Sequence, residues 1–177
     1  MLKAHTLTEA RLYLKITACE KCEPRPKGVR KQTKEIDHSR CVKLNELCPS
    51  CGSARELEFA IEPPEATPDE GRPAPINFTQ EPSQIIDVGQ WLTLSQLFLQ
   101  ESSAERDRSR ARLLSLQAAQ CLDEALKFYD DPENDLPPSN AFYCNASHRR
   151  FRESPQQFSR TRLISEKRKL PVIFGEP

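Results

Sequence analysis

The chain has 177 residues, with 26 Lys or Arg balanced by 26 Asp or Glu, so no global field draws it toward nucleic acid or a membrane surface. Hydrophobic residues make up 37% of the chain, and no apolar run approaches the roughly 20 residues that a membrane-spanning helix needs. Fifteen prolines against five glycines indicate stiff connectors between small units rather than one large core.

The first third, residues 1–62, is predicted to be a small β domain. Leucine and isoleucine alternate with Tyr, Lys and Thr over 12–17, and Leu57, Phe59 and Ile61 alternate with Glu56, Glu58 and Glu62. Alternation with period 2 is typical of half-buried strands. A third strand is predicted over 41–44. The polar, basic stretch 23–40 is predicted to be an exposed loop.

Four of the seven cysteines form two CxxC pairs, separated by 25 residues: Cys19, Cys22, Cys48 and Cys51. A CxxC turn lets two thiolates bind one metal ion, and four thiolates complete a tetrahedral shell with Zn–S bonds near 2.3 Å. Gly52, directly after the second pair, permits the left-handed backbone that such a turn favours. We therefore expect these four side chains to bind a single structural zinc ion.

The order strand, CxxC, long excursion, strand, CPxCG and strand resembles the zinc-ribbon class over about residues 10–62. This resemblance implies a ribbon stabilised by zinc. It does not imply one activity, because zinc ribbons serve in nucleic-acid machinery, in protein adaptors and as purely stabilising appendages. Zinc would dominate the stability of so small a unit, and we expect chelation to unfold residues 10–62 while sparing the helical part.

Three other interpretations of the cysteines stay open. A redox-active dithiol would need a helix N-terminus to lower a thiol pKa, iron could use the same four ligands, and the spacing could be accidental. Cys41, His38 and His5 are alternative ligands. The chain begins without the apolar core of an export signal, which favours a cytoplasmic, reducing location and metal binding over a disulfide framework.

The rest of the chain is predicted to be a proline-rich acidic linker, 63–89, and a helical domain, 90–177. Apolar residues at spacings of three and four predict two helices over 90–130, with a capping box at Ser102 and Glu105 between them. Ser154, followed by proline, predicts the start of a final basic helix that ends near Leu170. The fold class is therefore α+β, with a β zinc ribbon, a linker, a helical hairpin and a basic helical tail.

No nucleophile, base and acid occur together at suggestive spacing, so we predict a non-enzymatic zinc-binding adaptor that contacts another protein. Trp91 and Leu97 are its candidate partner contacts. The alternative is an accessory protein that binds nucleic acid through the basic loop 25–40 and the basic tail 149–169, with Phe151 and Phe158 stacking on bases. Its candidate contacts are Arg25, Lys27, Arg30, Lys31, Arg149, Arg150, Arg152, Arg160 and Arg162.

Overall fold

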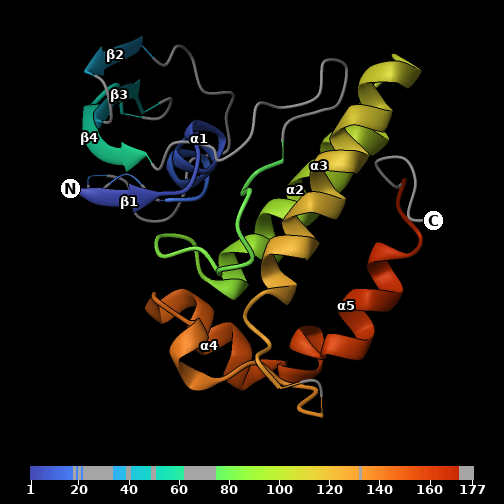
Figure 1. Ribbon diagram of the computed structural model, residues 1–177. Helices are drawn as coiled ribbons and strands as arrows, with labels where there is room; N and C mark the ends of the chain where they lie inside the picture. Colours follow the sequence, from blue (N-terminus) through green and yellow to red (C-terminus); the bar gives the residue numbers. More distant parts are fainter. Residues whose placement is uncertain are drawn as a thin grey trace. The chain divides into compact units, whose positions relative to one another are not determined.

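The structure contains both helices and strands, which confirms the predicted α+β class at this coarse level (Figure 1). It is a computed structural model that describes residues 1–17, 19, 21, 34–38 (backbone only), 41–48, 51–61, 75–131 and 133–171. The chain divides into two compact units, Met1–Ala66 and Thr67–Pro177, each of which has its own core.

The N-terminal unit is built on a four-stranded sheet with the order β1-β4-β3-β2. Its strands are β1 (Leu2–Ala4), β2 (Lys34–His38), β3 (Cys41–Leu47) and β4 (Ala54–Ile61). β3 runs antiparallel to both β2 and β4, whereas β1 lies parallel to β4. The strands predicted after residue 40 and after the second cysteine pair are therefore confirmed, and the parallel β1 was not predicted. The prediction of an exposed loop over 23–40 is wrong at 34–38, because these residues pair with β3 as the strand β2.

The strand predicted just before the first cysteine pair is wrong, because those residues belong to a helix, α1 (Leu7–Ile16). Thr6 is its N-cap, and the Thr6 hydroxyl accepts a hydrogen bond from the Glu9 amide at 3.0 Å. Ala10 and Leu14 lie four residues apart and are both buried, as one face of a helix requires. The first unit is thus a sheet with a helix and not an all-β ribbon.

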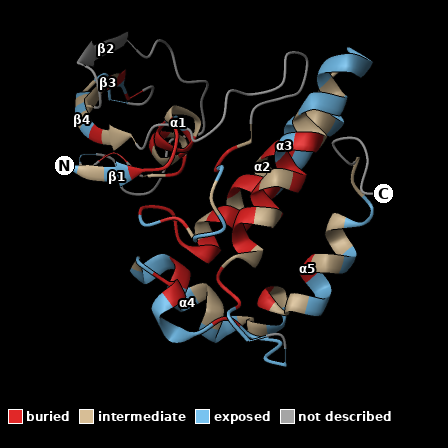
Figure 2. Cartoon of the chain, viewed as in Figure 1, coloured by how far each residue is buried: buried red, intermediate tan, exposed pale blue. Residues whose placement is uncertain are grey.

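The second unit is built around a helical hairpin formed by α2 (Val88–Ala104) and α3 (Arg108–Leu126), as predicted. The Ser95 hydroxyl on α2 donates to the Ala118 carbonyl on α3 at 3.0 Å, so the two backbones approach closely. Both helices carry buried residues along part of their length (Figure 2). No helix in the described part of the chain is long and apolar enough to cross a membrane.

The capping box of this hairpin is at the start of α2 and not between the helices. Asp87 and Gln90 exchange side-chain and backbone hydrogen bonds there, while α3 begins at its own N-cap, Asp107. The Ser102 hydroxyl instead donates to the Ala111 carbonyl at 2.8 Å. The predicted Ser102 cap is therefore wrong, because this side chain ties the two helices together.

Part of the predicted linker 63–89 packs into the helical unit. Ile76 and Ile86 are buried, and the Asn77 amide donates to the Glu124 carboxylate on α3 at 3.3 Å. The section from residue 75 to the start of α2 is therefore an irregular packed segment, and residues 62–74 lie outside the described residues.

The final helix predicted from Ser154 to about Leu170 is two shorter elements, a 3-10 turn η2 (Pro155–Phe158) and α5 (Arg160–Lys167). A separate helix, α4 (Asn145–Glu153), precedes them and was not predicted. Ser154 gives no side-chain cap, whereas the Ser159 hydroxyl accepts from the Arg162 amide at 3.2 Å and starts α5. Phe151 and Phe158 pack edge to face with ring centroids 5.4 Å apart, and Phe158 is fully buried. Phe158 is therefore part of the core and is not free to stack on a base, and the half-buried Phe151 packs against it.

Candidate metal centre

Three of the four predicted ligands come together in the N-terminal unit. Cys19 follows the end of α1, Cys48 follows β3, and Cys51 lies in the turn that leads to β4. Their sulfur atoms all lie within 4.8 Å of one another, and the Cys19 and Cys51 sulfurs are 3.8 Å apart. Tetrahedral bonds near 2.3 Å place neighbouring sulfurs roughly 3.8 Å apart, so this spacing suits one ion.

The turn between β3 and β4 has the backbone that the sequence predicted. Gly52 adopts φ of 68°, in the left-handed region that glycine enters without a steric penalty. The Gly52 amide donates to the Cys48 carbonyl at 2.8 Å, and the Cys48 amide donates to the Ser53 carbonyl at 2.9 Å. The Ser53 hydroxyl lies 3.2 Å from the Cys51 sulfur, within hydrogen-bond reach. This turn therefore fixes both sulfurs of the second pair.

The cluster is closed on one side and open on the other. Cys19 and Cys48 are buried, with 5% and 3% of their surface exposed, while Cys51 is exposed. Three close thiols of this kind could hold a metal ion. Cys22, the fourth predicted ligand, lies outside the described residues, so its part in the shell stays a prediction.

Arg55 connects the two segments that carry the clustered cysteines. Its guanidinium donates to the carbonyls of Leu14 and Thr17 at the end of α1, at 3.1 and 3.0 Å. It also forms an ion pair with Glu46 on β3, whose side chain is 4% exposed. Thr17 and Glu46 each precede a clustered cysteine by two residues, so Arg55 sets the distance between them. Sequence reasoning missed this residue, because its partners are not close in the chain.

The alternative ligands do not join the cluster among the described side chains. The Cys41 sulfur lies 3.8 Å from the sulfur of Met1, and His5 is buried at the start of α1. The side chain of His38 lies outside the described residues. Cys121 is fully buried in the hairpin and Cys144 is half-buried beside the Ser147 hydroxyl, at 3.2 Å.

The predicted nucleic-acid contacts divide between the loop after the first cysteine pair and the C-terminal helices. The loop residues Arg25, Lys27, Arg30 and Lys31 lie outside the described residues. Arg149 and Arg152 are exposed on α4, Arg160 and Arg162 lie on α5, and Arg150 turns inward.

The two predicted partner contacts lie on α2. Trp91 is fully buried, so its side chain cannot contact a partner directly and this predicted contact is wrong. Leu97 is half-buried.

No protein-family model, curated protein or solved structure matches this chain. What the protein does is therefore inferred from its own residues.

Proposed function

We propose that this protein is a non-enzymatic cytoplasmic adaptor whose N-terminal unit is held together by one structural zinc ion. Cys19, Cys22, Cys48 and Cys51 are the ligands, in an arrangement similar to a zinc ribbon with a helix before its first knuckle. The observation that carries the metal site is the spacing of the three described sulfurs, which all lie within 4.8 Å of one another.

Zinc is the metal that this ligand set suits best in a structural role. Thiolate ligands in tetrahedral geometry select zinc or iron, and a site that uses four protein ligands leaves no open position for a substrate. The unit is small, and structural zinc contributes roughly 10–16 kcal/mol of apparent free energy in small peptides. Such an ion would dominate the folding of the first unit.

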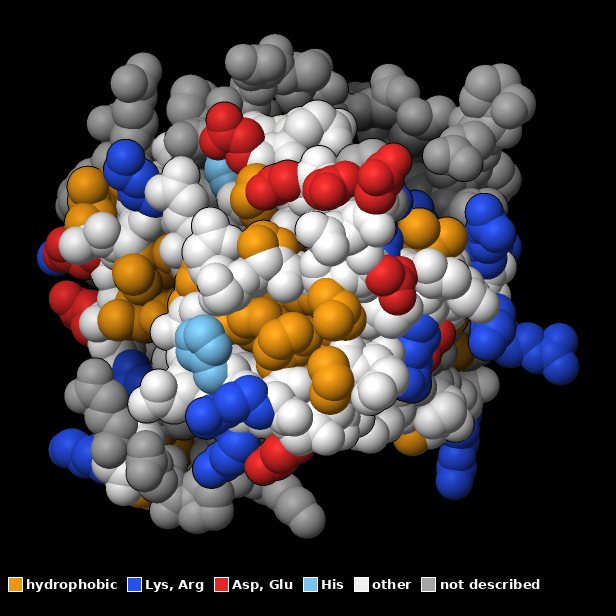
Figure 3. Space-filling model, turned by 90° about the horizontal axis from the view of Figure 1, so that it is seen from below, with side chains coloured by type: hydrophobic (Ala, Val, Ile, Leu, Met, Phe, Trp, Pro, Cys, Tyr) orange, Lys and Arg blue, Asp and Glu red, His pale blue; other side chains and the backbone are white. Residues whose placement is uncertain are grey.

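Exposed apolar side chains in the second unit support the adaptor role. Leu113 on α3 is 52% exposed, and Leu136 and Tyr143 before α4 are 42% and 48% exposed. Figure 3 shows that hydrophobic side chains also form a patch on the surface, with a histidine and basic side chains beside it. A gathered apolar surface with a polar rim is typical of a protein-interaction site.

The metal is tested by elemental analysis of the purified protein. We expect one zinc per chain, with Cys48→Ser and Cys51→Ser each losing most of it. Cys41→Ser is the matched control, since it removes a thiol from the same unit but outside the cluster, and it should keep the ion. Iron in place of zinc, or equal loss in all three variants, would contradict the proposed site.

The adaptor role is tested by affinity purification with nuclease treatment, comparing wild type with Leu113→Ser and Tyr143→Ser. We expect a protein partner that survives the nuclease and is lost in at least one of these variants. The control is a double substitution of Arg149 and Arg152 by Gln, which should keep the partner. The nucleic-acid alternative would be favoured if the protein bound single-stranded RNA or DNA with an affinity that falls steeply with salt. That binding should also be lost in the double substitution of Arg149 and Arg152.

A further inference from the structure

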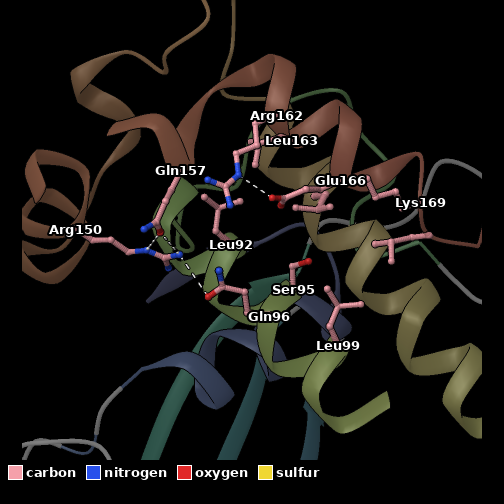
Figure 4. Close-up of a pocket in the computed structure, with 12 residues that line it drawn as sticks. Leu92, Ser95, Gln96, Leu99, Arg150, Gln157, Arg162, Leu163, Glu166 and Lys169 are labelled. Carbon is pink, nitrogen blue, oxygen red and sulfur yellow. Dashed lines mark hydrogen bonds and ion pairs between the residues drawn. The ribbon is translucent and has the colours of Figure 1, made fainter. Parts of the chain in front are cut away.

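The helical unit contains a small cavity of about 190 Å³, a pocket open to solvent on one side, between α2, α3, α4, η2 and α5 (Figure 4). Its apolar walls are leucines, of which Leu92, Leu122 and Leu163 are 4%, 3% and 1% exposed. Leu99, 36% exposed, and Leu170 also line it. A dry cavity of roughly 150 Å³ holds a benzene ring, so this one has room for a ring or branched alkyl group and a few more atoms.

Arg150 projects into this cavity from α4 (Figure 4). Its guanidinium donates to the Gln157 carbonyl oxygen at 2.9 and 3.1 Å and to the Thr93 hydroxyl at 3.0 Å. A longer bond of 3.4 Å reaches Gln96. All these acceptors are neutral, and within the described part of the chain no carboxylate forms an ion pair with Arg150.

The other charged groups of the lining do not neutralise this positive charge, and the guanidinium also lies over the Phe158 ring, 5.7 Å from its centroid. Arg162 forms an ion pair with Glu166 at 2.8 Å, which uses the one carboxylate among the described lining residues, and Lys169 adds another cation. Burial lowers the pKa of Arg150, and the nearby charge of Arg162 lowers it further. Both effects belong to a guanidinium that is partly removed from water and lies near a second cation.

We propose that the cavity binds a small organic acid, with its carboxylate on Arg150 and its apolar group among the leucines. A guanidinium has five N–H donors in a planar fork that matches a carboxylate. The bonds to Gln157 and Thr93 use three of these donors. The bond to Gln96 is the longest and therefore the weakest, so a bound carboxylate could replace it most easily. The volume sets the apolar group at roughly six to nine carbons. The site lies wholly in the helical unit and does not rest on the proposed metal or adaptor role.

The test compares an acid with its amide on the full-length protein. We expect 3-phenylpropanoate to bind one to one in a nuclear magnetic resonance titration, with shifts on α2, α4 and α5. The neutral 3-phenylpropanamide has the same shape without the charge, and it should bind roughly tenfold more weakly or worse. Inorganic phosphate should also bind more weakly, because it has no apolar group. Equal affinity for acid and amide, or stronger binding of phosphate, overturns the proposal.

Two variants and a matched control locate the site. Arg150→Gln should weaken binding of the acid at least about tenfold, because a charge-assisted pair is lost. Arg149→Gln removes the neighbouring charge, which does not line the cavity, and should bind as wild type. Arg150 also bonds to Thr93 and Gln157, so folding is checked by circular dichroism. Leu99→Trp narrows the rim without touching those bonds and should weaken the acid and the amide alike. Wild-type affinity in Leu99→Trp, or equal losses in the two arginine variants, overturns the site.

Discussion

Arg55 joins α1 to β3 in the N-terminal unit through its bonds to Leu14, Thr17 and Glu46. Its substitution by methionine would remove the guanidinium that pairs with the Glu46 carboxylate, whose side chain is 4% exposed. Breaking a buried ion pair from one side costs roughly 3–5 kcal/mol. We therefore expect Arg55→Met to destabilise this unit by about that amount and to release zinc more readily. Chemical denaturation followed by a colorimetric zinc indicator would measure both.

The control is another cation on the same sheet. Lys43 pairs with Glu58, but the two side chains are 37% and 45% exposed, and water screens such pairs. Lys43→Met should leave stability and zinc release close to wild type. If the two variants behaved alike, the buried position of Arg55 would not be what matters.

Asp135 gives the start of α5 a dependence on pH. Hydrogen bonds from Ser159, from the Thr161 amide at 2.8 Å and from the Thr161 hydroxyl hold the pKa of this carboxyl below its ordinary 3.8. The charged form is the one stabilised, so the contribution is complete above about pH 4 and is lost as pH falls through the lowered pKa. We expect the Thr161 amide resonance to titrate with a midpoint below 3.8.

Asp135→Asn should abolish that titration. Asp130→Asn, an exposed change just after α3 and its closing turn, should leave it unchanged. A midpoint at or above 3.8 in the wild-type protein would mean that these hydrogen bonds do not favour the charged carboxylate in solution.

Among the elements, the start of α2 is joined to the start of α4 and the residues just before it by one carboxylate. Asp87 is fully buried and accepts hydrogen bonds from the Gln90 amide at 2.8 Å and the Ser147 hydroxyl at 2.7 Å. It also accepts from the Tyr143 and Cys144 amides, at 3.0 and 3.2 Å. Gly89 permits this close contact, since a Cβ atom there would lie 2.6 Å from the Ser147 hydroxyl oxygen. The Asp87 side chain is therefore both a helix cap and a clamp between two elements.

Asp87→Ala should cost the helical unit about 3 kcal/mol or more, because several buried donors lose their acceptor at once. Asp107→Ala removes the cap of α3 at an exposed position and should cost only about 1 kcal/mol. Fluorescence of Trp91, the single tryptophan, reports unfolding of this unit in both variants. Similar losses in the two would show that Asp87 acts as a cap alone.

These elements show which features of the fold could be predicted from the sequence. CxxC spacing and Gly52 predicted the second cysteine turn, because the chemistry of that turn is local. Leu12, Leu14 and Ile16 predicted a strand wrongly, because a residue and its fourth neighbour share a helix face as well as a strand face. The Thr6 cap, three residues before Glu9, was the local signal that distinguishes the two. Arg55 and Asp87 gave no such signal, because their partners meet only in the folded chain.

For the whole molecule, the division into two units predicts two separate responses to metal removal. With a strong chelator under reducing conditions, we expect the amide resonances of β3 and β4 to collapse while those of α2 and α3 persist. The reason is that the proposed ion joins segments of the first unit alone. Loss of both sets together, or of neither, would contradict this expectation. Restoring the spectrum with zinc is the control for irreversible thiol oxidation.

The parallel pairing of β1 with β4 has a consequence for synthesis of the protein. Leu2 lies opposite Phe59, so the sheet cannot close until nearly all of the first unit has left the ribosome. Cys19 is made 32 residues before Cys51, which is roughly 2–6 s at common rates of translation. During that interval the first cysteine pair has been synthesised and the second has not. The first pair is thus the one most open to oxidation in a nascent chain, and arrival of the second pair sets when an ion is captured.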